Sequence, residues 1–168
     1  MQFLSIVIRK ARIEDTQVIM DMTNKAYSIY FGSTGIAFKR TNRYPGPRYQ
    51  NTSEIETNLD SFYVLLQDKK IIGAVKAKPN GSIVKIGSLA IDPDHQGKGY
   101  GSKLLTYVES LAPVAQLPFI SCQTNLLPFY FKRGYREVRR QFISELIASE
   151  PSLADVTRDN LELITLQK

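Results

Sequence analysis

The chain has 168 residues, 43% of them hydrophobic and 23% charged, and its formal net charge is +6 at pH 7. This length and composition fit a single globular domain, 1–168, with a sizeable core. No apolar run approaches the ~20 residues of a membrane helix, and the basic residues near the N-terminus follow an apolar run instead of preceding it. We therefore expect neither a membrane segment nor a secretory signal.

The cysteine and histidine content narrows the possible chemistry. Cys122 is the only cysteine and His95 the only histidine, which leaves neither an internal disulfide nor a Cys/His metal site. We expect a reducing, cytoplasmic location and no metal. The pI near 9.4 favours anionic partners. A polyphosphate cofactor and a nucleic acid both qualify, but no run of Lys and Arg interleaved with aromatic residues favours the nucleic acid.

The first half of the chain predicts a strand, a helix and an antiparallel meander. Alternation at 4–8 predicts a strand whose apolar face is Leu4, Ile6 and Ile8. Apolar residues four apart predict a helix over about 15–30, with its stripe at Val18, Met22, Ala26 and Tyr30. A loop at 31–51 and a short capped helix at 53–56 follow. Strands at 62–66, 71–78 and 83–91 form the meander, with turns at 68–70 and Asn80–Gly81 and an irregularity at Gly87–Ser88.

The second half predicts helices and strands that alternate. A helix follows the glycine-rich loop and runs to about Ala112, where Pro113 closes it. A short buried strand at 119–122 precedes a helix at 126–133, which Gly134 ends. Strands begin at Tyr135 and at about 161, while the polar stretch 149–159 fits no element. The order of elements predicts a mixed α/β layer structure.

The segment Gln96–Gly101 lies between the third strand of the meander and the next helix. Its three glycines at alternate positions leave the backbone bare, so that several N–H groups can meet one phosphate. The start of the helix adds unpaired N–H donors and the positive end of its dipole. Lys98 and Lys103 add positive charge. These features predict a site for a phosphate or a pyrophosphate.

Two common phosphate-binding motifs do not fit this segment. A P-loop needs Gly-Lys-Ser/Thr after a longer spacer, and that pattern is absent. A dinucleotide fingerprint needs a third glycine where Ser102 stands, and it needs a βαβ unit instead of a meander. The glycines by themselves are equally compatible with a tight turn between strand and helix, so the surrounding residues have to decide.

Two motifs resemble the signatures of the GNAT superfamily of N-acetyltransferases. The loop matches Gln/Arg-x-x-Gly-x-Gly/Ala through Gln96, Gly99 and Gly101. Further on, Tyr130 stands four residues before Gly134, and Tyr135 follows where the family usually has Phe. The resemblance covers roughly 62–138. The segments 31–51 and 139–160 match nothing in the family pattern.

The resemblance implies a mostly antiparallel mixed sheet of about seven strands flanked by about four helices. In such a fold the strand 83–91 splays away from the parallel strand that follows it. The acyl donor implied is acetyl-CoA, whose pantetheine arm would pair with Leu89, Ala90 and Ile91. The residues implied to hold its pyrophosphate are Gln96, Gly97, Lys98, Gly99, Tyr100, Gly101 and Ser102. Asn125 and Phe129 would line the far side of the cofactor.

Tyr130 is the candidate catalytic residue. The family transfers an acetyl group from coenzyme A to a primary amine, and a phenol beside the sulfur can protonate the leaving thiolate as a general acid. Periodicity alone favours a core aromatic in the run Phe129-Tyr130-Phe131, and the motif register is what points to catalysis. Phe131 is predicted to be a packing residue.

The general base is open. Residues 85–88 hold no carboxylate, although many relatives carry a Glu there. The alternatives, which the sequence does not separate, are a water chain to a backbone carbonyl or to Ser88 and the carboxylates Glu54, Glu56 and Asp60. His95 is expected to be a turn residue, and Cys122 an inert buried thiol.

The acceptor is expected to be a small-molecule or peptide amine. Tyr27 and Tyr30 are candidate lining residues, and the basic loop 31–53 would favour an acceptor that carries an acidic group. The alternative function is an acyl-CoA-binding sensor without turnover, and a basic nucleic-acid-binding domain is a third possibility. The chain would act as a monomer or a homodimer.

Overall fold

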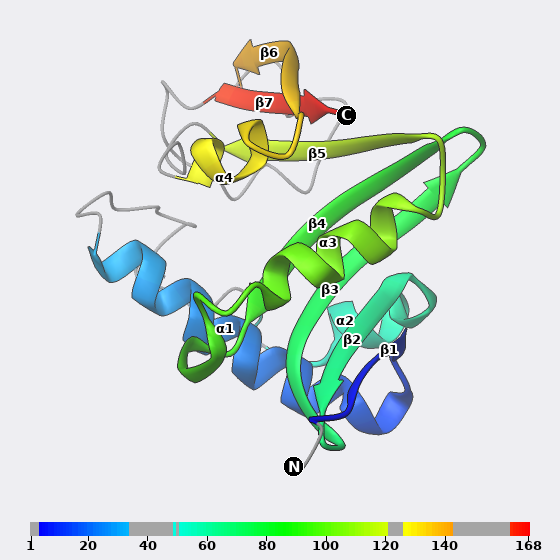
Figure 1. Cartoon of the computed structure of the whole chain (residues 1–168), viewed down its shortest axis with the longest axis vertical. Coiled ribbons are helices and arrows are strands. Elements are labelled where there is room, and N and C mark those ends of the chain that lie inside the picture. The colour runs from blue at the N-terminus through cyan, green and yellow to red at the C-terminus, as the bar shows by residue number, and fades with distance from the viewer. Residues whose placement is uncertain (1–3, 34–48, 50, 121–125, 143–161) are drawn as a thin grey trace.

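The computed structural model describes residues 4–33, 49, 51–120, 126–142 and 162–168, with side chains from 28–33 and 119–120 left aside (Figure 1). Within these residues, seven strands form one sheet in the order β1-β2-β3-β4-β5-β7-β6. The strands are β1 Ile6–Lys10, β2 Phe62–Gln67, β3 Lys70–Asn80, β4 Ile83–Ile91, β5 Val114–Ile120, β6 Arg136–Phe142 and β7 Glu162–Gln167. The helices are α1 Thr16–Ser33, α2 Ser53–Thr57, α3 Tyr100–Glu109 and α4 Leu127–Phe131. The mixed sheet with flanking helices confirms the predicted fold class.

The sheet carries a hydrophobic layer on each face. Side chains alternate along a strand, so Phe62 and Val64 of β2 pack in one cluster with α1 and α2, while Tyr63 and Leu65 pack in the other. The second cluster contains the buried face of α3, formed by Leu104, Leu105 and Val108. Helices α1 and α3 therefore cover opposite faces, and the strands between them support the loop that begins α3. None of the helices described combines the length and apolar character that a bilayer crossing requires.

Strands β4 and β5 run parallel but pair only where Ile83–Lys85 meets Val114–Gln116. On its other side β5 pairs with β7, and there Ala115 exchanges backbone hydrogen bonds of 2.9 and 3.0 Å with Lys168, directly after β7. Because the bonding direction alternates along an antiparallel pair, the next backbone nitrogen of β5 that faces β4 after residue 116 belongs to Pro118. Proline has no N–H, so the parallel ladder finds no donor there. The two strands then diverge, as Figure 1 shows, and confirm the splayed pair.

The same proline explains why the start of β5 was misplaced by sequence reasoning. The strand predicted at 119–122 begins at Val114, directly after Pro113, and its last residue described is Ile120. Pro118 interrupts the strand pattern, because a proline inside a strand normally costs a ladder hydrogen bond. At this position its missing donor faces the splay, so the strand continues through it.

A bulge bends β4 beside the splay. Between the pairs Ala74–Ala90 and Lys76–Gly87, β4 contains one residue more than β3. Ser88 lies in this extra stretch with a left-handed φ of 51°, and such a bulge increases local twist and re-aims the strand. The irregularity predicted at Gly87–Ser88 is confirmed.

Two predicted apolar faces are wrong in part. Met22 and Ala26 of the predicted stripe are buried, as are Ile19 and the polar Thr23, whereas Val18 is 45% exposed and lies outside the buried face of α1. Leu4 is 59% exposed and precedes β1. In both places the sequence pattern was right about the element, but the neighbouring elements decided which side is covered. Helix α3 ends at Glu109, slightly before the predicted Ala112.

Asp15 anchors the start of α1 to β1. Its carboxylate accepts hydrogen bonds from Arg9 Nη1 at 2.7 Å, from Arg9 Nη2 at 3.2 Å and from the Arg12 backbone N–H at 2.7 Å. Burial opposes ionisation of Asp15, but the Arg9 and Arg12 bonds outweigh it and hold the pKa of this carboxyl below its usual range. The ionised form is therefore the one that stabilises the fold.

Asp15→Asn is expected to lower the free energy of unfolding by about 1.5–3 kcal/mol at pH 7, because it removes charge-assisted hydrogen bonds from a buried site. A carboxyl whose pKa is lower in the native state than in the unfolded state stabilises the fold at pH values above its unfolded pKa. This stabilisation is lost as the pH falls through the native pKa. The difference between wild type and variant should thus shrink below about pH 4. Urea unfolding at pH 7 and at acid pH measures it, with Glu14→Gln as control, since Glu14 is exposed. A difference that is constant with pH would contradict this role.

Candidate cofactor site at the start of helix α3

The loop after β4 is held by its own side chains. Asp92 begins the 3-10 turn Pro93–His95 and accepts a hydrogen bond from the Asp94 backbone N–H at 2.9 Å. Gln96 Nε2 donates to the Ile91 carbonyl at 3.0 Å and so ties the loop to the end of β4. Gly97 and Gly99 have φ of 74° and 82°, the left-handed region that favours glycine. The glycine positions are thus needed for the backbone path itself.

Helix α3 opens toward solvent with unused donors. Gly99 is its N-cap and supplies no side-chain cap. The first helical hydrogen bond runs from Lys103 N to Gly99 O at 3.0 Å, so the N–H groups of the first turn, Tyr100, Gly101 and Ser102, have no acceptor within the helix. Together with the helix dipole they form a site that suits an anion.

Helix α4 borders this site. The ring of Phe129 lies close to the α3 backbone, since a Cβ placed on Gly101 would be 4.0 Å from its Cζ and 3.6 Å from Ile91 Cγ1. Arg133 stacks over that ring at 5.0 Å and donates from Nη1 to Ser102 Oγ at 2.6 Å. The structure therefore brings Phe129 to the glycine loop, as expected. Sequence reasoning did not single out Arg133, whose partner Ser102 lies 31 residues away.

The remaining predicted cofactor residues divide into backbone and side-chain roles. Ala90 and Ile91 are buried and Leu89 is half-buried, so β4 can offer only its backbone. Tyr100 turns its hydroxyl away from the loop and donates to Gln67 Oε1 at 2.9 Å. Lys98 Nζ bonds the Asp94 carbonyl at 3.2 Å. Asn125 lies outside the described residues.

Tyr130 is buried, with 6% of its surface exposed. Its ring makes edge contacts with Phe129 at 5.0 Å and with Tyr135 at 5.7 Å, and its carbonyl accepts the backbone N–H groups of Arg133 and Tyr135. Its catalytic role stays a prediction, because this packing also suits a core aromatic. Phe131, predicted to pack, is 47% exposed, since it lies on the outer side of the short helix.

A family comparison shows which family the chain belongs to. The Acetyltransferase (GNAT) family model matches residues 23–135, which is more than half of the chain. The chain belongs to the GNAT family of acetyltransferases. The matched range includes β4, the glycine loop and α4.

Solved structures with the GNAT fold agree with this assignment. N-acetylglutamate synthase from Neisseria gonorrhoeae, complexed with coenzyme A and N-acetyl-glutamate, matches 98% of the chain with a TM-score of 0.65 and 17% identity, but the chain spans only 35% of that protein. PaiA N-acetyltransferase from Thermoplasma acidophilum, in complex with coenzyme A, matches with a TM-score of 0.63 and 16% identity, and the match covers 98% of both chains. Polyamine N-acetyltransferase from Drosophila melanogaster matches with a TM-score of 0.68 and 14% identity, and the match covers 98% of this chain and 99% of that one. At these identities the likeness shows the fold.

On the other face of the GNAT sheet, Tyr49 lies against the β4 bulge. Its backbone exchanges two 2.8 Å hydrogen bonds with the side chain of Asn24, and its hydroxyl lies 3.0 Å from Ser88 Oγ. Tyr49 is only 2% exposed. Sequence reasoning placed Tyr49 in a loop and did not single it out, since its partners Asn24 and Ser88 lie 25 and 39 residues away. The contact places Ser88, one of the candidate proton acceptors, in a fixed position.

The other acceptor-side candidates are less constrained. Glu54 and Glu56 are exposed on α2, and Asp60 is exposed on the 3-10 turn that follows. Tyr27 is half-buried on α1, and the side chain of Tyr30 lies outside the description. Their roles as base or lining residues stay predictions.

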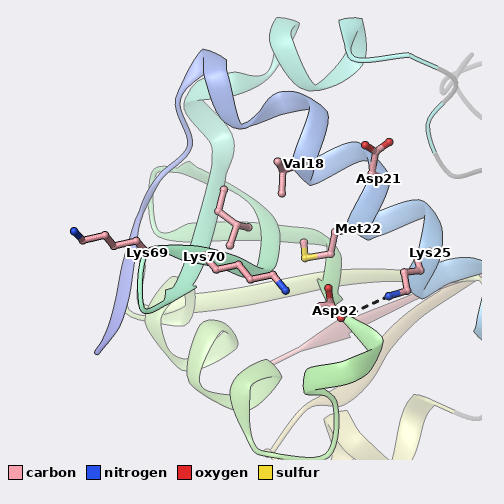
Figure 2. A pocket seen from close by; sticks show the side chains of 8 residues that line it. Val18, Asp21, Met22, Lys25, Lys69, Lys70 and Asp92 are labelled. Atoms are coloured by element: carbon pink, nitrogen blue, oxygen red, sulfur yellow. Dashed lines mark ion pairs between the residues drawn. The ribbon is translucent and has the colours of Figure 1, made fainter. Parts of the chain in front are cut away.

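A groove of about 510 Å³ lies between α1 and the start of β3. Figure 2 shows Lys70 reaching along it toward Asp92, while Lys69 points away. Lys25 lies 3.9 Å from Asp92 and 3.5 Å from Asp94. Burial opposes ionisation of Asp92, but the Asp94 N–H and the Lys25 ammonium outweigh it, so the pKa of Asp92 is lowered. These contacts attach α1 to the start of the glycine loop.

His95 is a turn residue, as expected. It ends the 3-10 turn before the glycine loop, and its Nδ1 lies 3.6 Å from Asp92 Oδ1. That separation is too long for a hydrogen bond. Cys122 lies outside the described residues.

Proposed function

We propose that the chain is an acetyl-CoA-dependent N-acetyltransferase that acts on a primary amine through a ternary complex. The observation that carries this proposal is the coincidence of two features at one end of β4. A helix start with N–H groups that have no acceptor inside the helix follows the strand, and among the residues described β4 pairs with β5 only as far as Lys85. An extended arm attached to a pyrophosphate suits such a pair, since the arm can pair with the strand. Relatives complexed with coenzyme A support this donor.

In the proposed complex, acetyl-CoA supplies a thioester that a neutral amine can attack. The N–H groups of Tyr100, Gly101 and Ser102 would bind the pyrophosphate, and the backbone of Leu89 to Ile91 would align the pantetheine arm. Tyr130 would give its phenolic proton to the leaving sulfur as general acid. The amine must lose a proton first, and Ser88 at the bulge is one residue that a water chain could use. No carboxylate in β4 performs this step.

The acceptor proposed is a small-molecule or peptide amine. Solved relatives include enzymes named for glutamate and polyamine acetylation, and the candidate lining residues are Tyr27 and Tyr30. We also propose that residues 1–168 act as one domain, in the cytoplasm, as a monomer or homodimer.

The direct test is thiol release. Protein, acetyl-CoA and a panel of amino acids, polyamines and short peptides are mixed, and free thiol is followed together with the mass of the acetylated amine. We expect amine-dependent release for at least one class. The absent β4 carboxylate keeps a second function in view, an acyl-CoA sensor without turnover. Tight acetyl-CoA binding with no release on any amine would favour the sensor, and salt-sensitive DNA binding unaffected by acetyl-CoA would contradict both.

A further inference from the structure

We propose that Arg133 is a phosphate-binding residue of this site, held by Phe129 and Ser102 so that its guanidinium binds the pyrophosphate of coenzyme A. This inference rests on the proposed function, because it names a further residue for the same donor. Neither the glycine-loop motif nor the Tyr130 motif specifies a residue type at this position. Three observations on Arg133 carry the inference.

The first is its place. Arg133 Nη1 bonds Ser102 Oγ at 2.6 Å, and Ser102 is the third residue of α3. The backbone N–H groups of that same turn have no acceptor inside the helix. The guanidinium therefore lies beside the N–H groups that an anion would contact, although Arg133 belongs to the turn after α4 and not to α3.

The second is its rigidity. The guanidinium stacks on the Phe129 ring at 5.0 Å, and the ring itself lies against Gly101. A stacked arginine is fixed in orientation, so little rotamer freedom remains to be lost when it binds a ligand. Because Gly101 has no side chain, the Phe129 ring can lie close to the backbone of α3.

The third is its charge. Among the residues with described positions, no carboxylate pairs with Arg133, which is half-buried and uses one N–H on the neutral Ser102 hydroxyl. A partly desolvated cation gains most from an anionic partner, and the planar fork of arginine matches two phosphate oxygens. The N–H groups of α3, its dipole and the guanidinium would then act on the same group.

The alternative is a purely structural role, in which Arg133 only fastens α4 to α3. The two roles predict different effects of an Arg133 substitution on ligands with and without phosphate groups. Arg133→Met keeps apolar contact with Phe129 but removes the charge, and Arg133→Lys keeps the charge but not the fork. Affinities for coenzyme A and 3′-dephospho-coenzyme A are measured by calorimetry, and turnover with S-acetylpantetheine, which lacks every phosphate, is measured in parallel.

We expect Arg133→Met to weaken coenzyme A and 3′-dephospho-coenzyme A alike, by about 10- to 100-fold, as one charge-assisted contact implies. The KM of Arg133→Met for S-acetylpantetheine should stay within about 2-fold of the wild-type value. The affinity of Arg133→Lys for coenzyme A should lie between those of wild type and Arg133→Met, since lysine keeps a point charge. Arg12→Met, which removes an exposed charge near β1, is the matched control and should bind like wild type. If Arg133→Met does not fold, the same comparison is made with Arg133→Lys.

Three results would overturn the inference. An equal loss with S-acetylpantetheine means a structural role, a loss with coenzyme A alone means a contact to the 3′-phosphate, and unchanged affinity means no contact. A wild-type chain that binds no coenzyme A would overturn the proposed function as well, whereas wild-type binding with an unaffected Arg133→Met variant overturns only the arginine.

Discussion

Gly99→Val is expected to lower the affinity for acetyl-CoA by at least about 100-fold, a loss of roughly 2.7 kcal/mol in binding free energy. Gly99 has a φ of 82° and is the N-cap of α3. A β-branched residue is a strong outlier in this conformation, so the loop must rearrange. The same side chain would also stand where a phosphate has to approach the N–H groups of the first turn.

Gly81→Val separates these two effects. Gly81 has a φ of 60° in the β3–β4 turn, and the space around an added Cβ is open there, as it is at Gly99. Both variants should lose similar thermal stability, but only Gly99→Val should lose acetyl-CoA binding by calorimetry. Two variants with equal affinity would show that the loop is only a turn.

Tyr130→Phe is expected to lower kcat by about 100-fold or more while the Kd for acetyl-CoA stays nearly unchanged. Removing one hydroxyl keeps the ring and its contacts with Phe129 and Tyr135, so the packing persists. A proton donor to the leaving thiolate acts on the chemical step and not on ground-state binding. Single-turnover rates together with calorimetry measure the two quantities.

Tyr135→Phe is the matched control. Tyr135 is buried and donates to Glu109 Oε1 at 2.9 Å, and burial together with Glu109 raises its pKa. Loss of the Tyr135 hydroxyl should lower the free energy of unfolding by about 1 kcal/mol. Glu109 retains its ion pair with Lys168 at 2.9 Å. Its kcat should be close to that of wild type. Equal kcat for both variants would remove Tyr130 from catalysis.

Local patterns were sufficient for most of the fold. Alternation and turn residues placed the meander, and the Asn80–Gly81 hairpin is where it was expected. The glycine loop could be proposed as an anion site because the features that suggest one are local, a bare backbone joined to a helix start. The family motif then chose the ligand class, which backbone geometry alone does not do.

Long-range contacts account for what the sequence did not reveal. Arg133 meets Ser102 and Tyr49 meets Asn24 across 31 and 25 residues, and no periodicity connects them. The break between β4 and β5 depends on Pro118 facing a strand that is distant in sequence. Thr23 is buried and Val18 exposed because the sheet, and not the helix pattern, decides which side of α1 is covered.

A crystal structure with acetyl-CoA bound tests the central claim most directly. We predict pyrophosphate oxygens on the backbone N–H groups of Tyr100 to Ser102, the pantetheine arm along the open edge of β4, and the Tyr130 hydroxyl within hydrogen-bond distance of the thioester sulfur. A pyrophosphate bound away from the start of α3, or a sulfur out of reach of Tyr130, would contradict the account.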